Sequence, residues 1–451
     1  MISIKNYYYQ ILKNYFKYYV IPNSSILQLG EENGVILEYL EASSGVIIKK
    51  SKDIINSYKK KFPDYSFINI DINKDKLNIK NKFDYIIISD VIRDIEDIQY
   101  FFNKISNLCN KNTRIIISYS NKFWGPIFKL AELLKIKKKE VKQNWVDSES
   151  LKNIIKLSNF EIIKENKKII LPIYLPIFNY FFNNILSNLP IFRNLCLLNF
   201  VHLRYKFKER VSHKKVSIII PTKNERGNIE NAIKRIPKFG KSQEIIFVDG
   251  NSKDNTYEEI LKNIKKYKNL NIKLFKQVGS GKGDAVRCGF KNAKGDILMI
   301  LDADLTVPPE ELVKFYDAVI FNHGEFINGS RFVYPMEKNA MRFLNMIGNK
   351  FFTNFLSYSI NQTLTDTLCG TKVLLKKDYI KIEENRKFFG NFDPFGDFDL
   401  IFGASRLNLK IIDIPIRYQE RTYGTTQISR FYHGWLLIKM SFYALIKIKL
   451  I

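Results

Sequence analysis

Short apolar runs alternate with polar stretches of helical spacing along most of the chain. In the first 168 residues the apolar runs cover 25–30, 45–48, 67–71, 83–90 and 113–119, with a helical pattern over 96–108. In the second half they cover 216–220, 244–248, 272–275 and 297–301. Apolar runs of about four to eight residues bounded by turn signals indicate buried strands, and their alternation with helices indicates parallel sheets. The pattern therefore predicts the α/β fold class, with two separate sheets.

Two stretches depart from this pattern and suggest domain boundaries. Residues 169–192 carry no charge and are long enough to span a bilayer, but three prolines and four asparagines argue against a span. We expect 169–213 to be an aromatic helical connector against a membrane or another domain. The basic stretch 204–215, which follows the uncharged segment, would lie over anionic headgroups or form a solvated linker. The apolar, lysine-bearing stretch 431–451 predicts an amphipathic interfacial helix, or one packed on the preceding domain. The expected domains are therefore 1–168, 169–213, 214–430 and 431–451.

Composition limits the partners. The 451 residues carry a formal charge of +27, which suits an anionic membrane surface or phosphate-bearing ligands. The basic residues are spread along the chain and accompany no nucleic-acid motif, so we expect no nucleic acid partner. The four cysteines are far apart, and the Tyr- and Lys-rich start has no continuous apolar core. These features argue against a disulfide framework, a zinc site and a secretory signal, and predict a cytoplasmic protein.

Acidic residues follow the apolar run 297–301. Asp302 and Asp304 come directly after it, with Thr306 and two prolines beyond. Two carboxylates at the end of a buried strand are costly unless a cation meets them, and hard oxygen ligands suit Mg²⁺ or Mn²⁺. The alternative is a solvated Asp-x-Asp loop. The position favours a metal, because open α/β sheets bind ligands at the carboxyl ends of their strands.

Other polar residues follow the neighbouring runs in the same way. Glu225, Asp249, Lys282 and Asp302 each come just after a predicted strand of the second sheet. We therefore expect them to meet at one edge. Carboxylates can accept from ribose hydroxyls, and the glycines around Lys282 allow close backbone approach to a phosphate.

The stretch from residue 216 to 430 resembles the family-two inverting glycosyltransferases of the A-type fold, close to the polyprenyl-phosphate sugar transferases. The resemblance rests on SIIIPTKNERGNIENAI, EIIFVDGNSKDNT, GKGDAVRCGF, DILMILDADLTVPPEEL, INGSRF, TDTLCGTKVL and IPIRYQERTYGTTQISRF. It implies that a nucleotide diphosphate sugar is held by Pro221, Thr222, Asn224, Glu225, Asp249, Gly281, Lys282 and Asp302. It also implies metal ligation by Asp302 and Asp304, although the lipid-phosphate members often have a glutamine near the position of Thr306.

The second half of this domain supplies further cations and acids. Arginine suits bidentate phosphate recognition, so Arg331, Arg417 and Arg421 are candidates for binding the acceptor. Asp366, within the TDTLCGTKVL motif, is a candidate catalytic residue together with Asp302, Asp304 and Arg421. If the acceptor were a hydroxyl group, Asp366, Asp397 and Asp399 would be the candidate bases.

The first 165 residues resemble the class I S-adenosylmethionine-dependent methyltransferases, through LQLGEENG, FDYIIISDVIRDIEDI and RIIISYSN. The resemblance implies two Rossmann-like domains in the whole chain. Its cofactor positions depart from the family pattern, because Glu32 stands where a glycine is usual, and Lys49 and Lys50 stand where an acid normally binds the ribose. Asp71 is retained. We therefore expect a degenerate domain for which S-adenosylmethionine is an unlikely cofactor.

These inferences predict a metal-dependent inverting glycosyltransferase that moves a sugar from a nucleotide diphosphate sugar to a polyprenyl phosphate. We expect it at the inner face of the cell membrane as a peripheral protein. The alternatives are transfer to a hydroxyl of a glycan or lipid, and a bifunctional methyltransferase and glycosyltransferase. A scaffold without catalysis is disfavoured by the intact Asp-Ala-Asp motif.

Overall fold

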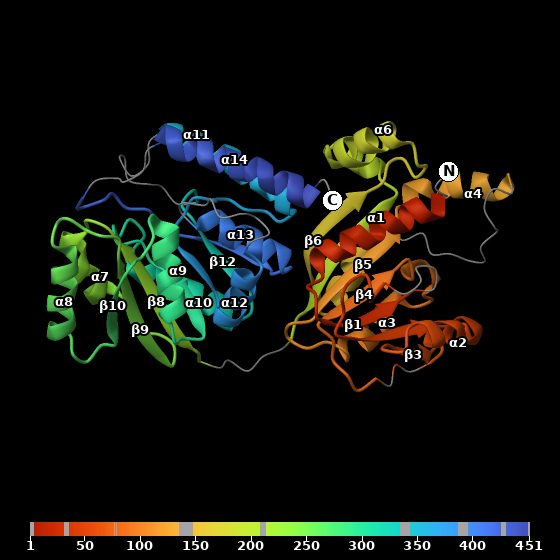
Figure 1. Ribbon diagram of the computed structural model, residues 1–451, viewed down its shortest axis with the longest axis horizontal. Coiled ribbons are helices and arrows are strands. Elements are labelled where there is room, and N and C mark those ends of the chain that lie inside the picture. The colour runs from red at the N-terminus through yellow and green to blue at the C-terminus, as the bar shows by residue number, and fades with distance from the viewer. Residues whose placement is uncertain are drawn as a thin grey trace. The chain divides into compact units, whose positions relative to one another are not determined.

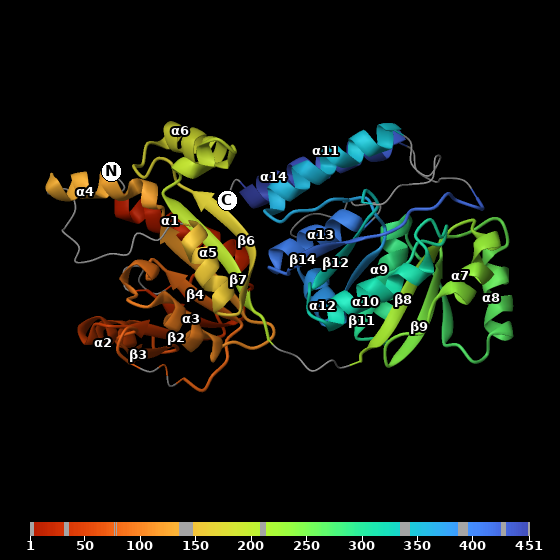
Figure 2. The same cartoon turned by 180° about the vertical axis from the view of Figure 1, so that it is seen from behind.

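The computed structural model describes residues 4–30, 36–75, 77, 79–134, 148–207, 213–333, 343–386, 396–424 and 430–449. The chain divides into two compact units, each built on its own sheet (Figures 1 and 2). Unit 1 comprises Met1–Lys208 with Lys449–Ile451, and unit 2 comprises Glu209–Ile448. The predicted α/β fold class is confirmed, and the domain boundaries proposed from the sequence stay predictions.

Unit 1 has a seven-stranded sheet in the order β3-β2-β1-β4-β5-β7-β6. The strands are β1 (Ser25–Leu29), β2 (Ser44–Lys49), β3 (Ser66–Asn69), β4 (Tyr85–Ser89), β5 (Arg114–Ser120), β6 (Phe160–Lys168) and β7 (Leu198–Tyr205). The first five are parallel, whereas β7 is antiparallel to both β5 and β6. The carboxyl ends of β1 to β5 therefore share one edge.

Unit 2 has a second seven-stranded sheet in the order β10-β9-β8-β11-β13-β12-β14. The strands are β8 (Lys215–Thr222), β9 (Ser242–Asp249), β10 (Ile272–Lys276), β11 (Ile297–Ile300), β12 (Phe326–Ser330), β13 (Lys372–Leu375) and β14 (Ile411–Pro415). All run in one direction except β13, which is antiparallel to its neighbours β11 and β12. Six strands thus present their carboxyl ends at the same edge.

Helices complete both units. Those of unit 1 are α1 (Ile4–Tyr19), α2 (Lys52–Lys61), α3 (Ile98–Ser106), α4 (Gly125–Leu133), α5 (Ser148–Leu157) and α6 (Pro176–Asn179). Those of unit 2 are α7 (Ile229–Arg235), α8 (Thr256–Lys266), α9 (Lys282–Asn292), α10 (Leu312–Ile320), α11 (Phe343–Ile360), α12 (Lys376–Glu384), α13 (Asp397–Arg406) and α14 (Arg430–Lys449). Helix α9 packs on β8 and β9, and α10 packs on β12 and β13.

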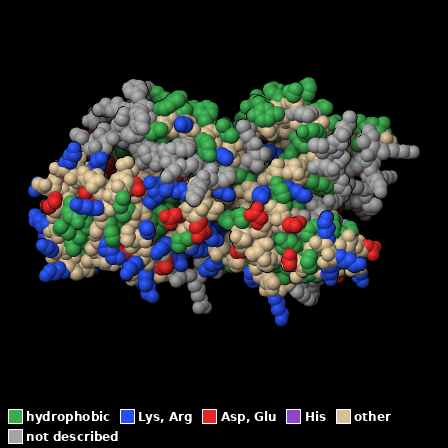
Figure 3. Space-filling view, viewed as in Figure 1, with side chains coloured by type: hydrophobic (Ala, Val, Ile, Leu, Met, Phe, Trp, Pro, Cys, Tyr) green, Lys and Arg blue, Asp and Glu red, His purple; other side chains and the backbone are tan. Residues whose placement is uncertain are grey.

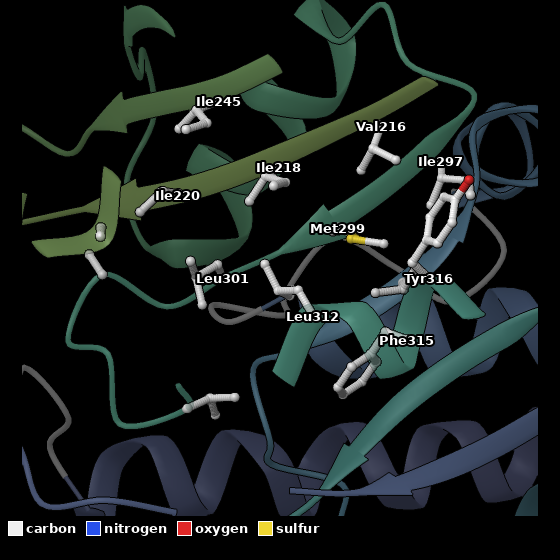
Figure 4. Close-up of a cluster of buried hydrophobic side chains, with 14 of the residues drawn as sticks. Val216, Ile218, Ile220, Ile245, Ile297, Met299, Leu301, Leu312, Phe315 and Tyr316 are labelled. Carbon is white, nitrogen blue, oxygen red and sulfur yellow. The ribbon is translucent and has the colours of Figure 1, made fainter. Parts of the chain in front are cut away.

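The core of unit 2 fixes the strands that end at the candidate site. Alternate residues of β8 and β11, including Ile218 and Met299, point into one apolar layer with Leu312 and Phe315 of α10 (Figure 4). These side chains are buried, and each fully buried side chain of this size contributes roughly 1.5–3 kcal/mol. Because the neighbouring strands share this layer, the loops at their carboxyl ends start from well-fixed positions.

Part of the segment expected to be a helical connector is instead a strand. Residues 198–205 form β7, which pairs along its whole length with β6 and fills the sheet of unit 1. Arg204, expected near anionic headgroups or in a solvated linker, is buried and donates to Glu161 at 2.8 and 2.6 Å. Neither strand was predicted, because charged residues interrupt their apolar pattern and pair across the two strands.

Two of the segments singled out in the sequence, 169–192 and 431–451, are at least partly helical. Residues 176–188 form a short irregular helix that begins with α6, and α14 packs Phe442 against Phe355 of α11, with ring centroids 5.4 Å apart. Within the described residues, no helix combines the length and apolar character needed to cross a bilayer.

Candidate active site

The residues expected to meet do so at the carboxyl edge of the unit 2 sheet. Thr222 ends β8, Asp249 ends β9, Asp302 follows β11, and Lys282 begins α9. The register pairs Thr222 with Asp249, so the loops after β8 and β9 leave the sheet side by side. The convergence predicted from the sequence is therefore present.

The loops after β8 and β9 hold each other through short polar contacts. The Thr222 hydroxyl donates to the Val248 carbonyl at 3.2 Å, and the Asn224 backbone N–H donates to the Ser252 hydroxyl at 3.0 Å. Asp249 is buried; its Oδ2 accepts from the backbone N–H of Ser252 at 3.3 Å, whereas its Oδ1 has no hydrogen-bond partner. A buried carboxylate oxygen without a donor is costly, and a ligand N–H or O–H can satisfy it.

Asp302 is paired with Lys282 across the site. The Lys282 ammonium lies 2.6 Å from the Asp302 carboxylate, and both side chains are about a quarter exposed. Burial opposes the charge on Lys282, but the carboxylates of Asp302 and Asp397 raise its pKa. A Cβ on Gly370 would lie 2.1 Å from Asp302 Oδ2 and 2.2 Å from Lys282 Nζ, so a larger residue there would displace this pair. The pair therefore brings a cation and an acid to the place where a diphosphate would lie.

Asp304 is bound from the other side by an arginine. Arg421 donates to the Asp304 carboxylate at 2.6 Å and to Glu225 at 2.8 Å, so one guanidinium bridges two acids. Thr306 donates its hydroxyl to Asp304 at 2.9 Å, which fixes the other carboxylate oxygen. Arg421, chosen from the sequence as an acceptor-binding residue, thus lies against the metal candidate Asp304.

Glu225 has an unusual protonation equilibrium. Burial raises the pKa of Glu225 to about 7, against the opposing effect of the Arg421 guanidinium. Its Oε2 also accepts from the Asn228 side chain at 2.8 Å. The pair with Arg421 therefore becomes fully ionised only as the pH rises above neutrality.

The segment that carries Arg421 packs on the loops that follow β8, β9 and β11. A Cβ on Gly227 would lie 2.5 Å from the Tyr423 ring, and the Tyr423 hydroxyl donates to Asp254 at 3.4 Å. Gln419 donates its backbone N–H to the Thr306 carbonyl at 2.9 Å. These contacts hold residues 419–423 over the loops that follow β8 and β11. Tyr423 was not predicted from the sequence, because only the folded chain brings its ring against Gly227.

Arg331 and Asp366 form a buried pair. Arg331 donates to the two carboxylate oxygens at 2.6 and 2.9 Å, and Asn349 donates to Asp366 at 2.6 Å. Asp366 is fully buried, and although burial opposes its ionisation, the Arg331 guanidinium holds its pKa below the usual range. Tyr418 covers the Arg331 guanidinium, with its ring centroid 5.1 Å away. Both residues therefore have structural partners that limit the roles expected for them, as an acceptor-binding cation and a catalytic acid.

The other candidate bases are also paired. Asp397, at the start of α13, lies 3.0 Å from the buried ammonium of Lys372. Asp399 lies 3.1 Å from Arg386, and burial raises the pKa of Asp399 against the effect of that arginine. Arg417, the third acceptor candidate, is exposed. Lys372 was not selected from the sequence, because a lysine within an apolar strand has no local signal for burial.

The carboxylates suit one divalent cation. No group of three or more histidine, cysteine or acidic side chains that could hold a metal occurs within the described ranges. Asp302 and Asp304 would therefore supply only two carboxylate ligands to such an ion. That donor set fits Mg²⁺ or Mn²⁺, which proteins bind through one or two carboxylates while substrate phosphates and water complete the shell.

The carboxyl edge of the unit 1 sheet carries two lysines at the end of β2. Lys49, at the end of β2, is buried and its ammonium donates to the Gly30 carbonyl after β1. Lys50 lies 3.2 Å from Asp71, the acid that follows β3. Glu32, the third departure from the methyltransferase pattern, lies outside the described residues. Two lysine ammonium groups thus stand at the end of β2, where a ribose would need acceptors.

Both halves match known domain families. Residues 217–382 match the family described as glycosyl transferase family 2, and residues 44–174 match a family described as a methyltransferase domain.

Curated relatives match the second half. A dolichol-phosphate mannosyltransferase of Pyrococcus furiosus is 42% identical over 121 residues, which cover 26% of this chain and 34% of the relative. An undecaprenyl-phosphate 4-deoxy-4-formamido-L-arabinose transferase of Salmonella paratyphi B is 34% identical over 103 residues, which cover 22% of this chain and 32% of the relative. The matches thus span about a third of the length of these two relatives.

Solved structures resemble each unit at low sequence identity. A glucosyl-3-phosphoglycerate synthase from Mycobacterium tuberculosis, in complex with Mn²⁺, uridine diphosphate and glucosyl-3-phosphoglycerate, has a TM-score of 0.38 and 16% identity, and the match covers 52% of this chain and 80% of that one. An S-adenosylmethionine-dependent methyltransferase from Mesorhizobium loti has a TM-score of 0.32 and 14% identity, with 45% and 98% covered.

The sheet edge of unit 2 is that of an α/β domain, with acids and cations gathered after parallel strands. The chain carries a family 2 glycosyltransferase domain in its C-terminal half, resembling the dolichyl- and undecaprenyl-phosphate sugar transferases, and a methyltransferase-like domain in its N-terminal half.

Proposed function

We propose that the protein transfers a sugar from a nucleotide diphosphate sugar to a polyprenyl phosphate, with inversion and with help from Mg²⁺ or Mn²⁺. The observation that carries this proposal is the arrangement of Asp302 and Asp304 between Lys282 and Arg421, at the edge where Asp249 has an unsatisfied oxygen. Four charged groups and a buried acceptor oxygen fit a nucleoside diphosphate better than an uncharged ligand.

Each side chain has a role in the proposed reaction. Asp249 would accept from the nucleoside, while Lys282 and Arg421 would contact diphosphate oxygens and hold the leaving group in line. The divalent cation, held by Asp302 and Asp304, would supply charge stabilisation of the departing diphosphate. Lys282 remains charged throughout, because the surrounding carboxylates raise its pKa.

A phosphate acceptor agrees better with this site than a hydroxyl acceptor. A phosphate monoester is largely dianionic near neutral pH and needs orientation more than deprotonation. Asp366 is buried and paired with Arg331, and Asp397 is paired with Lys372, so neither carboxylate is placed as an open general base. Transfer to a hydroxyl would leave the role of base to Asp399, which also has an arginine partner.

A lipid acceptor also requires contact with a membrane, and α11 and α14 offer a suitable surface. Leu437 and Ala444 of α14 are buried, whereas Trp435, Phe442 and Ile446 are exposed. Apolar and aromatic residues on one face, together with lysines, are typical of helices that lie in the interface of a bilayer. We propose that these helices place unit 2 at the membrane surface.

Arg421 is proposed to bind phosphate oxygens at the centre of the site. We expect Arg421→Ala to lower kcat/KM by roughly one to two decades, because about 1.5–3 kcal/mol of charge-assisted hydrogen bonding is lost. Separate titrations of the donor and the acceptor show which substrate Arg421 binds. Lost donor affinity would place Arg421 at the diphosphate, in agreement with its contact with Asp304. Retained donor affinity would place it at the acceptor. Arg421→Lys, which keeps the charge without the bidentate contact, should recover part of the loss. Unchanged kinetics in Arg421→Ala would contradict any role in catalysis.

Unit 1 is proposed not to use S-adenosylmethionine. Isothermal titration of the full chain should show no binding in the micromolar range, because the Lys49 ammonium occupies the end of β2 and cannot accept from ribose hydroxyls. A class I methyltransferase known to bind the cofactor serves as the positive control. Micromolar binding would contradict this expectation and favour the bifunctional alternative.

The acceptor class can be tested with matched lipids. Polyprenyl phosphate and the corresponding polyprenol are each incubated with a nucleotide diphosphate sugar and Mn²⁺. We expect glycosylation of the phosphate alone. Glycosylation of the alcohol alone would show that the acceptor is a hydroxyl group, and the enzyme would then need a general base.

A further inference from the structure

The helical segment 171–196 of unit 1 has its polar residues inside and its apolar residues outside. Asn179, Asn183 and Ser187 are at most 5% exposed, whereas Ile177 and Ile191 are 84% exposed. Helices that face water normally show the reverse pattern. We call this segment the apolar knob.

The buried asparagines give the knob a fixed shape. Asn183 accepts from the backbone N–H groups of Ile170 and Leu171 at 2.8 Å each, and its amide donates to the Tyr7 hydroxyl of α1 at 2.9 Å. Asn179 donates to the Ile173 carbonyl at 2.7 Å. The buried polar side chains therefore satisfy the irregular backbone from within. Most of the side chains that face outward are apolar or aromatic, with Asn194 as an exposed polar exception.

Helix α4 extends the same surface. Trp124, just before α4, donates its indole N–H to the Leu195 carbonyl at 2.9 Å, and Asn121 donates to the Asn194 carbonyl at 2.9 Å. Leu130 and Leu133 of α4 are 55% and 79% exposed. Hydrophobic side chains gather over α6 in the space-filling view (Figure 3). The knob and α4 together expose a group of apolar side chains, whereas exposed apolar residues on a typical surface are scattered singly. We call this group the apolar face.

Charge around this face is positive. No aspartate or glutamate occurs between Glu165 and Glu209, and Lys122 and Lys129 are exposed at and before α4. The half-buried Glu132 of α4 is the one acid among the described residues of these two segments. Apolar and aromatic groups flanked by lysines favour an anionic phospholipid surface.

We propose that unit 1 is a membrane-docking module, whose knob and α4 insert into the interface of an anionic phospholipid bilayer. The methyltransferase-like sheet then serves as the scaffold that presents this face. The proposal is independent of the sugar-transfer reaction, because it concerns phospholipid and requires no donor or acceptor.

A fluorophore on the knob tests the proposal directly. An environment-sensitive probe is attached at Ile177→Cys in the full chain, with Cys288→Ser, because the other three cysteines are buried. The matched control carries the probe at Leu157→Cys, an exposed residue of α5 outside the face. With phosphatidylglycerol vesicles we expect a blue shift and quenching by bromolipids at 177 and not at 157, weakened in pure phosphatidylcholine vesicles.

Vesicle partitioning of a second variant measures the contribution of the face. Ile177→Asp/Phe178→Asp/Ile191→Asp changes only exposed side chains, so the fold is retained, and we expect partitioning to fall by at least about tenfold. Leu157→Asp should have no effect. Unquenched probe at 177, or partitioning equal to that of the unmodified chain, would overturn the proposal. A blue shift of the probe at 177 without vesicles would also overturn the proposal. A shift that depends on protein concentration would show that a second copy covers the face, and a shift that does not would show that another part of the chain covers it.

Discussion

Replacement of Asp304 by asparagine is expected to reduce sugar transfer by roughly two to three orders of magnitude, with the fold intact. The change removes one charged ligand of the proposed metal and the acid partner of Arg421, which lies 2.6 Å away. Steady-state transfer at saturating Mn²⁺ measures the loss, and circular dichroism checks the fold.

Asp317→Asn provides the matched control for this variant. Asp317 is an exposed acid of α10 in the same unit, so its loss removes equal charge away from the site. Its activity should equal that of the unmodified chain, and a chelator should abolish the activity of both. Undiminished transfer by Asp304→Asn, or full activity in chelator, would rule out the metal role.

Replacement of Asp366 by alanine is expected to lower the free energy of unfolding of unit 2 by about 3–5 kcal/mol. The Arg331 guanidinium, whose side chain is 11% exposed, would lose both carboxylate contacts and remain as an unpaired buried charge. Denaturant unfolding of the full chain, followed by a probe in unit 2, measures the change.

An exposed pair in the same unit serves as the comparison. Arg235 contacts Glu310 through two bonds of 2.9 Å, with side chains 36% and 52% exposed. Glu310→Ala should cost no more than about 1 kcal/mol, because solvent screens this pair. Equal small effects of the two variants would show that burial does not determine the strength of the Arg331–Asp366 pair. If Asp366→Ala keeps its stability but loses activity, Asp366 takes part in the reaction.

The sequence predicted the parallel strands well, because each is a short apolar run that ends in a turn. The runs 216–220 and 297–301 correspond to β8 and β11, and Asp302 lies at the strand end where it was expected. Strands β6 and β7 escaped prediction, since Lys164 and Arg204 interrupt the apolar pattern and are nevertheless buried.

Partners in space were harder to predict than positions in a motif. Arg331 and Asp366 are 35 residues apart, and only the fold brings them together as a buried pair. The same holds for Arg421, whose two acid partners Glu225 and Asp304 belong to other strands' loops. The sequence identified these residues as charged members of motifs, whereas the structure distinguishes a structural pair from a bridge across the site.

The most direct test incubates the full chain with Mn²⁺, polyprenyl phosphate and a panel of nucleotide diphosphate sugars, and resolves the lipid products by mass. We predict that one donor adds a single sugar to the lipid phosphate and releases a nucleoside diphosphate. The Asp304→Asn variant should form this product roughly two to three orders of magnitude more slowly. A fully active Asp304→Asn enzyme, or a chain that never glycosylates polyprenyl phosphate while it does glycosylate a hydroxyl acceptor, would contradict these predictions.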